Sequence, residues 1–396
     1  MSKLFVPAIH LPHGAELFRT LGHRRSQYKK ILKALSERTL LECSPDDHVV
    51  LSSEPQAEFL EFLLDLGLGT KNIIVPPSVE SNLGQDVLGD PVAMEKISSL
   101  RPEEIRFYIH LEEEMEIARA AGLPGAVTNH SLTRMFNTTY FLIRLEEDMD
   151  LEAIPREQAR SSRLESVLNR MTEGGQKVFA RGNESCGGSQ VFILNDADDV
   201  SAMARKVSRN KSITRYFASK FIEGTESWNF QFFLDGAGGF SFWGASRQLL
   251  RDGGVHEGNV GGETPPPAGL RLSEKLAGRL SETGGKGFFG ADVLMDGDKA
   301  YPAELNMREN TSTPVLAVQR KIGPAYFKTV KIFVPRGYTF RGFVENIGAE
   351  KLLSAKTKSG LLPFNFASSD MTGYLDVAIF GDSLEEVEAE SPTLSF

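Results

Sequence analysis

Residues 288–310 read FFGADVLMDGDKAYPAELNMREN, and this stretch decides how the chain is interpreted. Successive strand residues point to opposite faces, so in AELNMR the polar residues Glu304, Asn306 and Arg308 share one face. The intervening MDGDKA has the Asp-Gly chemistry of a tight hairpin, which folds the strand with Asp292 back beside them. Two carboxylates and an amide then converge, which is the ligand type that Mg²⁺ prefers when it also holds phosphate oxygens. A hairpin with a solvated polar face has the same pattern, so the rest of the chain has to decide.

Length and composition limit the class of protein. At 396 residues the chain is longer than one hydrophobic core usually serves, so two or three domains or lobes are expected. The net charge of −9 argues against a nucleic acid as the main partner, because binding to a phosphate backbone depends on clustered Lys and Arg. No apolar run approaches the ~20 residues of a membrane span, and the first residues lack the long apolar core of a secretory signal. We therefore expect a cytoplasmic protein with no membrane partner.

The order of strand and helix patterns divides the chain. HVVLSS and NIIVPP are typical of strands and enclose PQAEFLEFLLDLGLG, which has helical spacing and ends in glycine. IRFYIHLEEEMEIARAAGLPG repeats this βαβ pattern, which suits a parallel sheet covered by helices. From about Asn137 onward, Gly-rich hairpins and helices replace that pattern, which indicates α+β lobes. The expected parts are residues 1–120, 121–215, 216–340 and a small strand-containing appendix, 341–396.

A Gly/Ser-rich loop follows a strand in KVFARGNESCGGSQVFIL. The strand delivers Arg181 to the loop, where glycines let backbone N–H groups lie over phosphates. A structural hairpin with a flexible tip has much the same sequence. Cys186 in this loop could be a nucleophile, but no partner His or Asp is apparent nearby. The other cysteine, Cys43, is far away and there is no CxxC, so neither a disulfide framework nor a zinc site is indicated.

A third motif, ASKFIEGTE, lies between the loop and the hairpin. Its strand Lys220-Phe221-Ile222 could present backbone groups to a purine edge, and Glu226 could reach ribose hydroxyls. An edge strand with a surface glutamate is the structural alternative. The order of the three motifs is more specific than any one of them.

In that order, residues 120–335 resemble the ATP-grasp superfamily of carboxylate–amine ligases. The resemblance implies a mixed α/β and α+β protein, in which an N-terminal α/β (pre-ATP-grasp) lobe precedes two lobes that clasp ATP. By position in the motifs, it implies the following roles: metal ligands Asp292, Glu304 and Asn306; substrate or phosphate cations Arg308 and then Arg247; phosphate contacts Arg181, Gly187, Gly188 and Ser189; adenine contacts Lys220 and Ile222; and a ribose ligand, Glu226.

The sequence departs from the family pattern at two cations. Arg181 stands where the family usually has a lysine, which conserves the charge but replaces a point charge by a planar fork. The family's first nucleotide-binding lysine is absent, because FNTTYFLIRL has Thr138 and Thr139 at that place. Arg134 or Arg144 could substitute for it. Within the superfamily, SRQLLRDGGVHEGNVGG and GLLPFNF resemble the peptide ligases associated with pheganomycin biosynthesis.

The resemblance implies a two-step reaction. With ATP and Mg²⁺, or Mn²⁺, a small carboxylate such as an amino acid or peptide becomes an acyl phosphate, and an amine acceptor then displaces phosphate. His256, in a glycine-rich stretch, could bind substrate or act as a base, although a lone loop histidine is more often neither. Transfer to a thiol or carrier protein, and a nucleotide-binding protein without catalysis, stay open as alternatives. A homodimer stays open as well.

Overall fold

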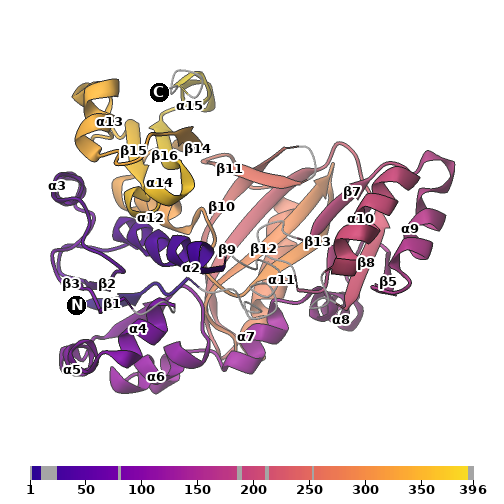
Figure 1. The fold of residues 1–396 in the computed structure, drawn as a ribbon, viewed down its shortest axis with the longest axis horizontal. Coiled ribbons are helices and arrows are strands. Elements are labelled where there is room, and N and C mark those ends of the chain that lie inside the picture. Colours follow the sequence, from indigo (N-terminus) through magenta and orange to yellow (C-terminus); the bar gives the residue numbers. More distant parts are fainter. Residues whose placement is uncertain are drawn as a thin grey trace.

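The first domain is an α/β unit built on a parallel sheet. The computed structural model describes residues 2–9, 25–78, 82–184, 190–209, 214–251 and 254–390. In the first sheet, of order β3-β2-β1-β4, neighbouring strands run parallel; the strands are β1 (Lys3–Val6), β2 (His48–Val50), β3 (Ile73–Ile74) and β4 (Glu104–Phe107). The nearby helices are α2 (Arg25–Ala34), α3 (Ala57–Asp65), α4 (Leu83–Gly89), α5 (Pro91–Leu100) and α6 (Glu112–Ala120). The predicted βαβ organisation is confirmed, with α3 between β2 and β3 (Figure 1).

The second unit, lobe A, is an antiparallel sheet covered on one face by helices. Its strand order is β5-β8-β6-β7, with β5 (Arg156–Arg160), β6 (Val178–Gly182), β7 (Val191–Leu194) and β8 (Arg215–Lys220). Helices α9 (Leu164–Thr172) and α10 (Ala197–Arg209) pack on it through a common apolar cluster that includes Leu168, Met203 and Tyr216. The opposite face of the sheet turns toward the rest of the molecule (Figure 1).

An eight-stranded sheet forms the largest layer. Its order is β13-β12-β9-β10-β11-β14-β16-β15; the strands are β9 (Glu226–Asp235), β10 (Phe240–Arg251), β11 (Val255–Gly261), β12 (Lys286–Asp296), β13 (Lys299–Asn306), β14 (Tyr326–Phe333), β15 (Gly360–Phe364) and β16 (Tyr374–Gly381). Helix α11 (Pro267–Glu282) packs against β9 and β12. On these strands the even-numbered aromatics Trp228, Phe230 and Phe232 are buried in the cluster under α11. The expected C-terminal appendix does contain strands, and they extend this sheet through β14.

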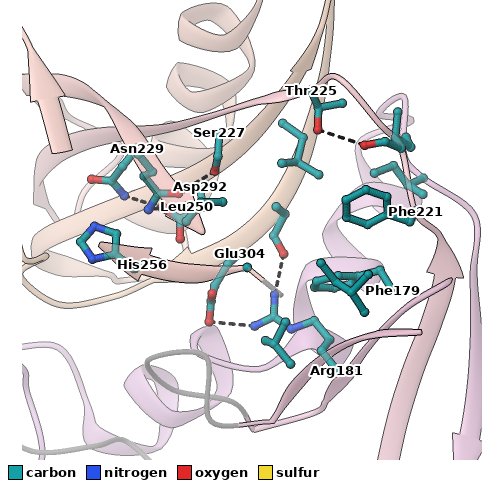
Figure 2. Close-up of a pocket in the computed structure, with 18 of the residues that line it drawn as sticks. Phe179, Arg181, Phe221, Thr225, Ser227, Asn229, Leu250, His256, Asp292 and Glu304 are labelled. Atoms are coloured by element: carbon teal, nitrogen blue, oxygen red, sulfur yellow. Dashed lines mark hydrogen bonds and ion pairs between the residues drawn. The ribbon is translucent and has the colours of Figure 1, made fainter. Parts of the chain in front are cut away.

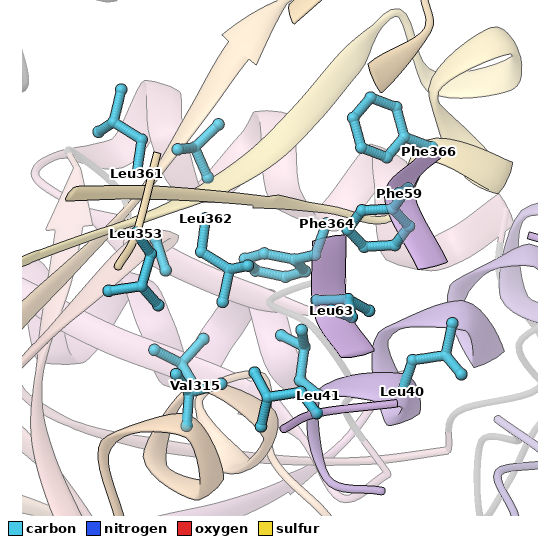
Figure 3. Close-up of a cluster of buried hydrophobic side chains, with 14 of the residues drawn as sticks. Leu40, Leu41, Phe59, Leu63, Val315, Leu353, Leu361, Leu362, Phe364 and Phe366 are labelled. Atoms are coloured by element: carbon cyan, nitrogen blue, oxygen red, sulfur yellow. The ribbon is translucent and has the colours of Figure 1, made fainter. Parts of the chain in front are cut away.

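The two ends of the chain share one apolar core (Figure 3). Phe59 of α3 lies 5.1 Å from the ring centroid of Phe366, which begins α14 (Phe366–Thr372). It lies 5.9 Å from Phe340, which begins α13 (Phe340–Ile347). The cluster also holds Leu40, Leu41, Leu63, Val315, Leu353, Leu361, Leu362 and Phe364. The first domain is thus packed against the C-terminal part rather than against lobe A.

Helices α7 (His130–Phe136) and α8 (Thr139–Asp148) connect the first domain to lobe A. Helix α12 (Thr313–Ile322) joins β13 to β14 within the large sheet, and α15 (Leu384–Glu390) follows β16. Within the described ranges, every helix is too short or too polar to cross a membrane.

Candidate active site

The predicted metal hairpin is present at the edge of the eight-stranded sheet. β12 and β13 pair antiparallel, with Asp292 opposite Glu304 and Gly290 opposite Asn306. The register shifts directly after Asp292, where β13 has one extra residue. Residues directly opposite each other share a face, so the two carboxylates project to the same side of the sheet.

Asp292 lies in a buried ring of amide donors. Asn229 Nδ2 donates to its Oδ1 at 2.6 Å, Gln248 Nε2 donates to the same oxygen at 3.2 Å, and Asn306 Nδ2 donates to Oδ2 at 3.1 Å. Burial and then the nearby Glu304 carboxylate raise the pKa of Asp292 to about 7, while the hydrogen bonds from Asn229 and Asn306 and the charge of Arg308 act in the opposite direction. A cation at this position would offset both unfavourable effects.

The donor set fits a hard divalent ion. Asp292, Glu304 and Asn306 supply two carboxylates and one amide, which suits Mg²⁺ when phosphate oxygens complete the coordination. Across the ranges that the structure describes, no group of three or more His, Cys, Asp or Glu side chains could hold a metal by itself.

Arg181 links lobe A to this hairpin. Its Nη2 lies 2.8 Å from Glu304 Oε1, and its Nη1 donates to the carbonyl oxygen of Ala303 at 2.9 Å. The arginine side chain is 8% exposed and the glutamate 32%, so the pair lies at the edge of the site and solvent reaches it from the glutamate side. The predicted phosphate cation and a predicted metal ligand therefore face each other across the two lobes (Figure 2).

Arg308 connects the site to the first domain. Its Nη2 donates to Asn306 Oδ1 at 2.7 Å, and its Nη1 donates to the hydroxyl of Tyr108 at 3.2 Å and to the carbonyl oxygen of Glu309 at 2.8 Å. The guanidinium also lies 5.9 Å from the centroid of the Tyr108 ring. The cation is held beside the predicted metal ligands by a residue that follows β4.

These residues line a cavity of about 740 Å³ between lobe A and the eight-stranded sheet. In Figure 2, Phe179 and Phe221 lie at one end, His256 and Leu250 at the other, and Asp292 and Glu304 between them. The volume is in the range of ligand and cofactor pockets. Lys220 and Ile222, predicted to contact adenine, line the cavity at the aromatic end.

Two predicted site residues do not line the cavity. Arg247 forms an ion pair with Glu263, with its Nε 2.9 Å from Oε2, and Glu226 accepts a hydrogen bond from Trp228 Nε1 at 3.0 Å. Their strand neighbours Gln248 and Ser227 line the cavity instead. Because strand residues alternate between faces, Arg247 and Glu226 lie on the other face of the sheet.

The remaining predictions concern the loop and the substitute for the absent lysine. Gly187, Gly188, Ser189 and Cys186 lie outside the described residues, so those predictions stay as they are. Arg134 pairs with Glu112 at 2.6 Å, and Arg144 pairs with Glu147 at 3.1 Å. Neither arginine is among the described residues that line the cavity.

Several residues that line the cavity were not predicted from the sequence. Lys177, directly before β6, and Phe179 of β6 line the cavity with Arg181, a periodicity of two that could have identified them. Arg156 of β5 also lines the cavity; it pairs with Glu146 and donates from Nη2 to the carbonyl oxygen of Pro302 at 2.8 Å. Its position depends on the order β5-β8-β6, which no local pattern gives. Asn229, Gln248 and Arg251 were missed as well.

Comparisons with known proteins bear on this arrangement. A family model described as the Pre ATP-grasp domain matches residues 36–123. The structure is similar to N5-carboxyaminoimidazole synthetase from Staphylococcus aureus (TM-score 0.56, 9% identity, 99% of this chain and 96% of that chain). It is similar to biotin carboxylase from Campylobacter jejuni in complex with β,γ-ATP (TM-score 0.59, 9% identity, 99% and 90%). It is also similar to L-amino acid ligase from Bacillus licheniformis (TM-score 0.53, 14% identity, 100% and 97%).

Proposed function

We propose that this chain, which has the ATP-grasp fold with an N-terminal pre-ATP-grasp domain, is an ATP-dependent carboxylate–amine ligase. The observation that carries the proposal is the convergence of Asp292, Glu304 and Asn306 with Arg181 and Arg308 in one cavity. The site joins oxygen ligands for a divalent ion to cations for phosphate and carboxylate groups. The structural neighbours include a ligase that acts on L-amino acids, which supports the class of reaction.

The chain's own residues divide the task along the cavity. Lys220, Ile222 and the Phe221 ring would hold the base, and Arg181 would hold the phosphates. Mg²⁺, or Mn²⁺, bound by Asp292, Glu304 and Asn306 would neutralise charge between the β- and γ-phosphates. Arg308 would orient the substrate carboxylate, whose oxygen attacks the γ-phosphorus to give an acyl phosphate and ADP.

An amine then attacks the acyl carbon, and phosphate leaves. The finer proposal is a peptide ligase of the type associated with pheganomycin biosynthesis. Its support is the resemblance of residues 246–262 and 360–366 to that branch. The described part of the first stretch lies mostly in β10 and β11, which border the cavity, and most of the second stretch lies in β15.

The test is a substrate screen. The protein is incubated with ATP, Mg²⁺ and pools of the proteinogenic amino acids, ADP release is measured, and the products are identified by mass spectrometry. We expect ADP release that depends on the pool, together with a new amide. A thioester with an added thiol in place of an amide would favour the thiol-transfer alternative, and tight ATP binding without any turnover would favour a binding protein.

A further inference from the structure

A chain of hydrogen-bonded polar side chains runs along the wall of the cavity from His256 to Asp292; Asn259, Ser312 and Asn229 also line the cavity, whereas Ser246 and Gln231 lie behind it. It crosses β11, β10, the start of α12, and β9. Its links are His256 Nε2 to Asn259 Oδ1 (2.9 Å), Asn259 Nδ2 to Ser246 Oγ (3.0 Å), Ser246 Oγ to Ser312 Oγ (3.2 Å), Gln231 Nε2 to Ser312 Oγ (2.7 Å), Gln231 Nε2 to Asn229 Oδ1 (2.8 Å) and Asn229 Nδ2 to Asp292 Oδ1 (2.6 Å).

The five side chains between the two ends are at most 2% exposed. Burying so many polar groups is unfavourable unless each is satisfied, and a satisfied network is rigid. One end of the chain is Asp292, the proposed metal ligand, and the other is His256. The network therefore holds the imidazole at a fixed place and orientation with respect to Asp292.

The network also determines the tautomer of His256. Asn259 donates through Nδ2 to Ser246, so the atom that it turns to the imidazole is Oδ1, which can only accept. His256 Nε2 must then carry the proton. The other ring nitrogen, Nδ1, is left with its lone pair and acts as an acceptor.

The surroundings keep this imidazole neutral. Burial lowers the pKa of His256, and the positive charge of Lys331 on β14 lowers it further, while the hydrogen bond with Asn259 acts in the opposite direction. On β10, Arg251 is the neighbouring charge, and its Nη1 pairs with Glu257 of β11 at 2.9 Å. A neutral imidazole near neutral pH can accept a proton.

The position of His256 in the cavity indicates the reaction step in which this residue acts. In the proposed function the adenine ring of ATP lies at the end of the cavity with Phe179 and Phe221, and the phosphates of ATP lie near Asp292 and Glu304. His256 lies at the opposite end, beyond the metal ligands (Figure 2). This is the part of the cavity that is left for the acceptor amine.

We propose that His256 is the general base for the acceptor amine, an inference that rests on the proposed function. As the amine nitrogen bonds to the acyl carbon, the proton on that nitrogen moves to Nδ1 of His256. The bond between the acyl carbon and the phosphate oxygen then breaks, and phosphate leaves with that electron pair. Asn259 is a positioning residue, because it acts through the imidazole.

The test separates the two half-reactions in His256→Asn. Hydroxylamine is unprotonated at neutral pH, so it traps the acyl phosphate without needing a strong base, whereas an amino acid must lose a proton. With ATP, Mg²⁺ and the amino-acid pool, we expect hydroxamate formation within twofold of the wild type. Amide formation should fall about 100-fold or more, since general-base catalysis contributes about 10²–10⁴-fold. The acidic limb of the pH–rate profile for amide formation should disappear.

Two further variants complete the experiment. His48→Asn changes a histidine of β2, away from the cavity, and should match the wild type in both assays. Asn259→Asp places a carboxylate beside His256 and raises its pKa, so the acidic limb should move to higher pH. This readout does not depend on the folding of His256→Asn.

Amide formation within threefold of the wild type in His256→Asn would overturn the inference and leave the ligase function standing. An equal loss of hydroxamate and amide would also overturn it, because His256 would then act before acyl transfer. An acidic limb of the pH–rate profile that does not move in Asn259→Asp would also overturn the inference. Absence of both ADP and hydroxamate with the wild type would overturn the proposed function itself.

Discussion

Two contacts between units of this molecule differ in kind. The first domain meets the C-terminal part through a cluster of aromatic and aliphatic side chains, with Phe59 at 1% exposure among the rings of Phe340 and Phe366. Lobe A meets the β12–β13 hairpin through arginines, in the ion pair of Arg181 with Glu304 and the hydrogen bond of Arg156 to a backbone oxygen.

The difference indicates which contact can serve a reaction. Apolar burial is roughly proportional to area and has no replacement partner in water, so the first contact favours one fixed arrangement. Charged groups, in contrast, can exchange one partner of opposite charge for another at little net free energy. The negative phosphates of a nucleotide could replace Glu304 as the partner of Arg181, and the positive metal ion could replace Arg181 as the partner of Glu304. We therefore expect substitutions at the polar contact to affect catalysis and substitutions at the apolar contact to affect stability.

The largest expected effect is at the hairpin. Glu304→Ala and Asn306→Ala each remove a proposed metal ligand and should lower ADP formation by about 1,000-fold or more, because the ion stabilises the transition state by several kcal/mol. Both variants should remain folded, as measured by circular dichroism and thermal unfolding. Wild-type activity of either variant with Mg²⁺ present would contradict the metal assignment.

The apolar contact gives the opposite pattern. Phe59→Ala should lower the free energy of unfolding by about 3–5 kcal/mol, since it removes a buried aromatic ring and leaves a cavity. The rate of ADP formation per folded molecule should stay unchanged, as measured well below the unfolding transition. Phe333→Ala is a matched control, because that ring is 81% exposed and its loss should change stability little. Equal destabilisation by both substitutions would argue against the packing role of Phe59.

The local part of this arrangement could be predicted from the sequence. The hairpin follows from the alternation in AELNMR and the Asp-Gly turn, and Asp292 does lie opposite Glu304. The same alternation could have placed Glu226 on the face of Trp228, away from the cavity. The motif ASKFIEGTE shows how far Glu226 lies from Ile222 along the chain. It does not show which residue of the neighbouring strand lies opposite Glu226, and this pairing determines the face on which the side chain lies.

The non-local part could not be predicted. Arg156 reaches the cavity because β8 lies between β5 and β6, with Ser219 opposite both Arg156 and Phe179. The last strands join the large sheet through the pairing of β14 with β16. Pairings between strands that are far apart in the sequence depend on packing throughout the core, so short sequence patterns do not predict them.

The polar contact can be tested more finely at Arg181. Arg181→Ala should weaken ATP binding by about 10–100-fold, which corresponds to the ~1.5–3 kcal/mol of a hydrogen bond to a charged group. Arg181→Lys should recover part of the affinity, because it restores the charge without the planar fork. The measurement is calorimetric titration with ATP and Mg²⁺.

Arg144→Ala is the control for this series, since Arg144 pairs with Glu147 on the surface of α8 and should bind ATP like the wild type. Unchanged affinity in Arg181→Ala would mean that another cation holds the phosphates. Arg156 is then the first residue to substitute, because it lines the same cavity.

A carboxyl group at the apolar contact makes the stability of the protein depend on pH. Glu37 lies just after α2, is 4% exposed, and accepts a hydrogen bond through Oε2 from the backbone N–H of Ala367 at 3.0 Å. Burial raises its pKa from 4.5 to about 7, more than the two backbone hydrogen bonds from Phe366 and Ala367 lower it. The folded protein therefore binds this proton more tightly than the unfolded chain does.

The sign of the pH dependence follows from this proton. Between pH 4.5 and 7 the folded state keeps the proton on Glu37 and the unfolded state has lost it, so stability falls as pH rises through this window. The group contributes a slope of about 1.4 kcal/mol per pH unit. Glu37→Gln cannot titrate, so its free energy of unfolding, measured by urea denaturation from pH 5 to 7, should lose that slope. Glu350→Gln changes an exposed glutamate and should keep the wild-type slope. Parallel curves for the wild type and Glu37→Gln would show that this carboxyl group is ionised inside the contact, and the apolar contact would then hold an unneutralised charge that the packing around Phe366 does not explain.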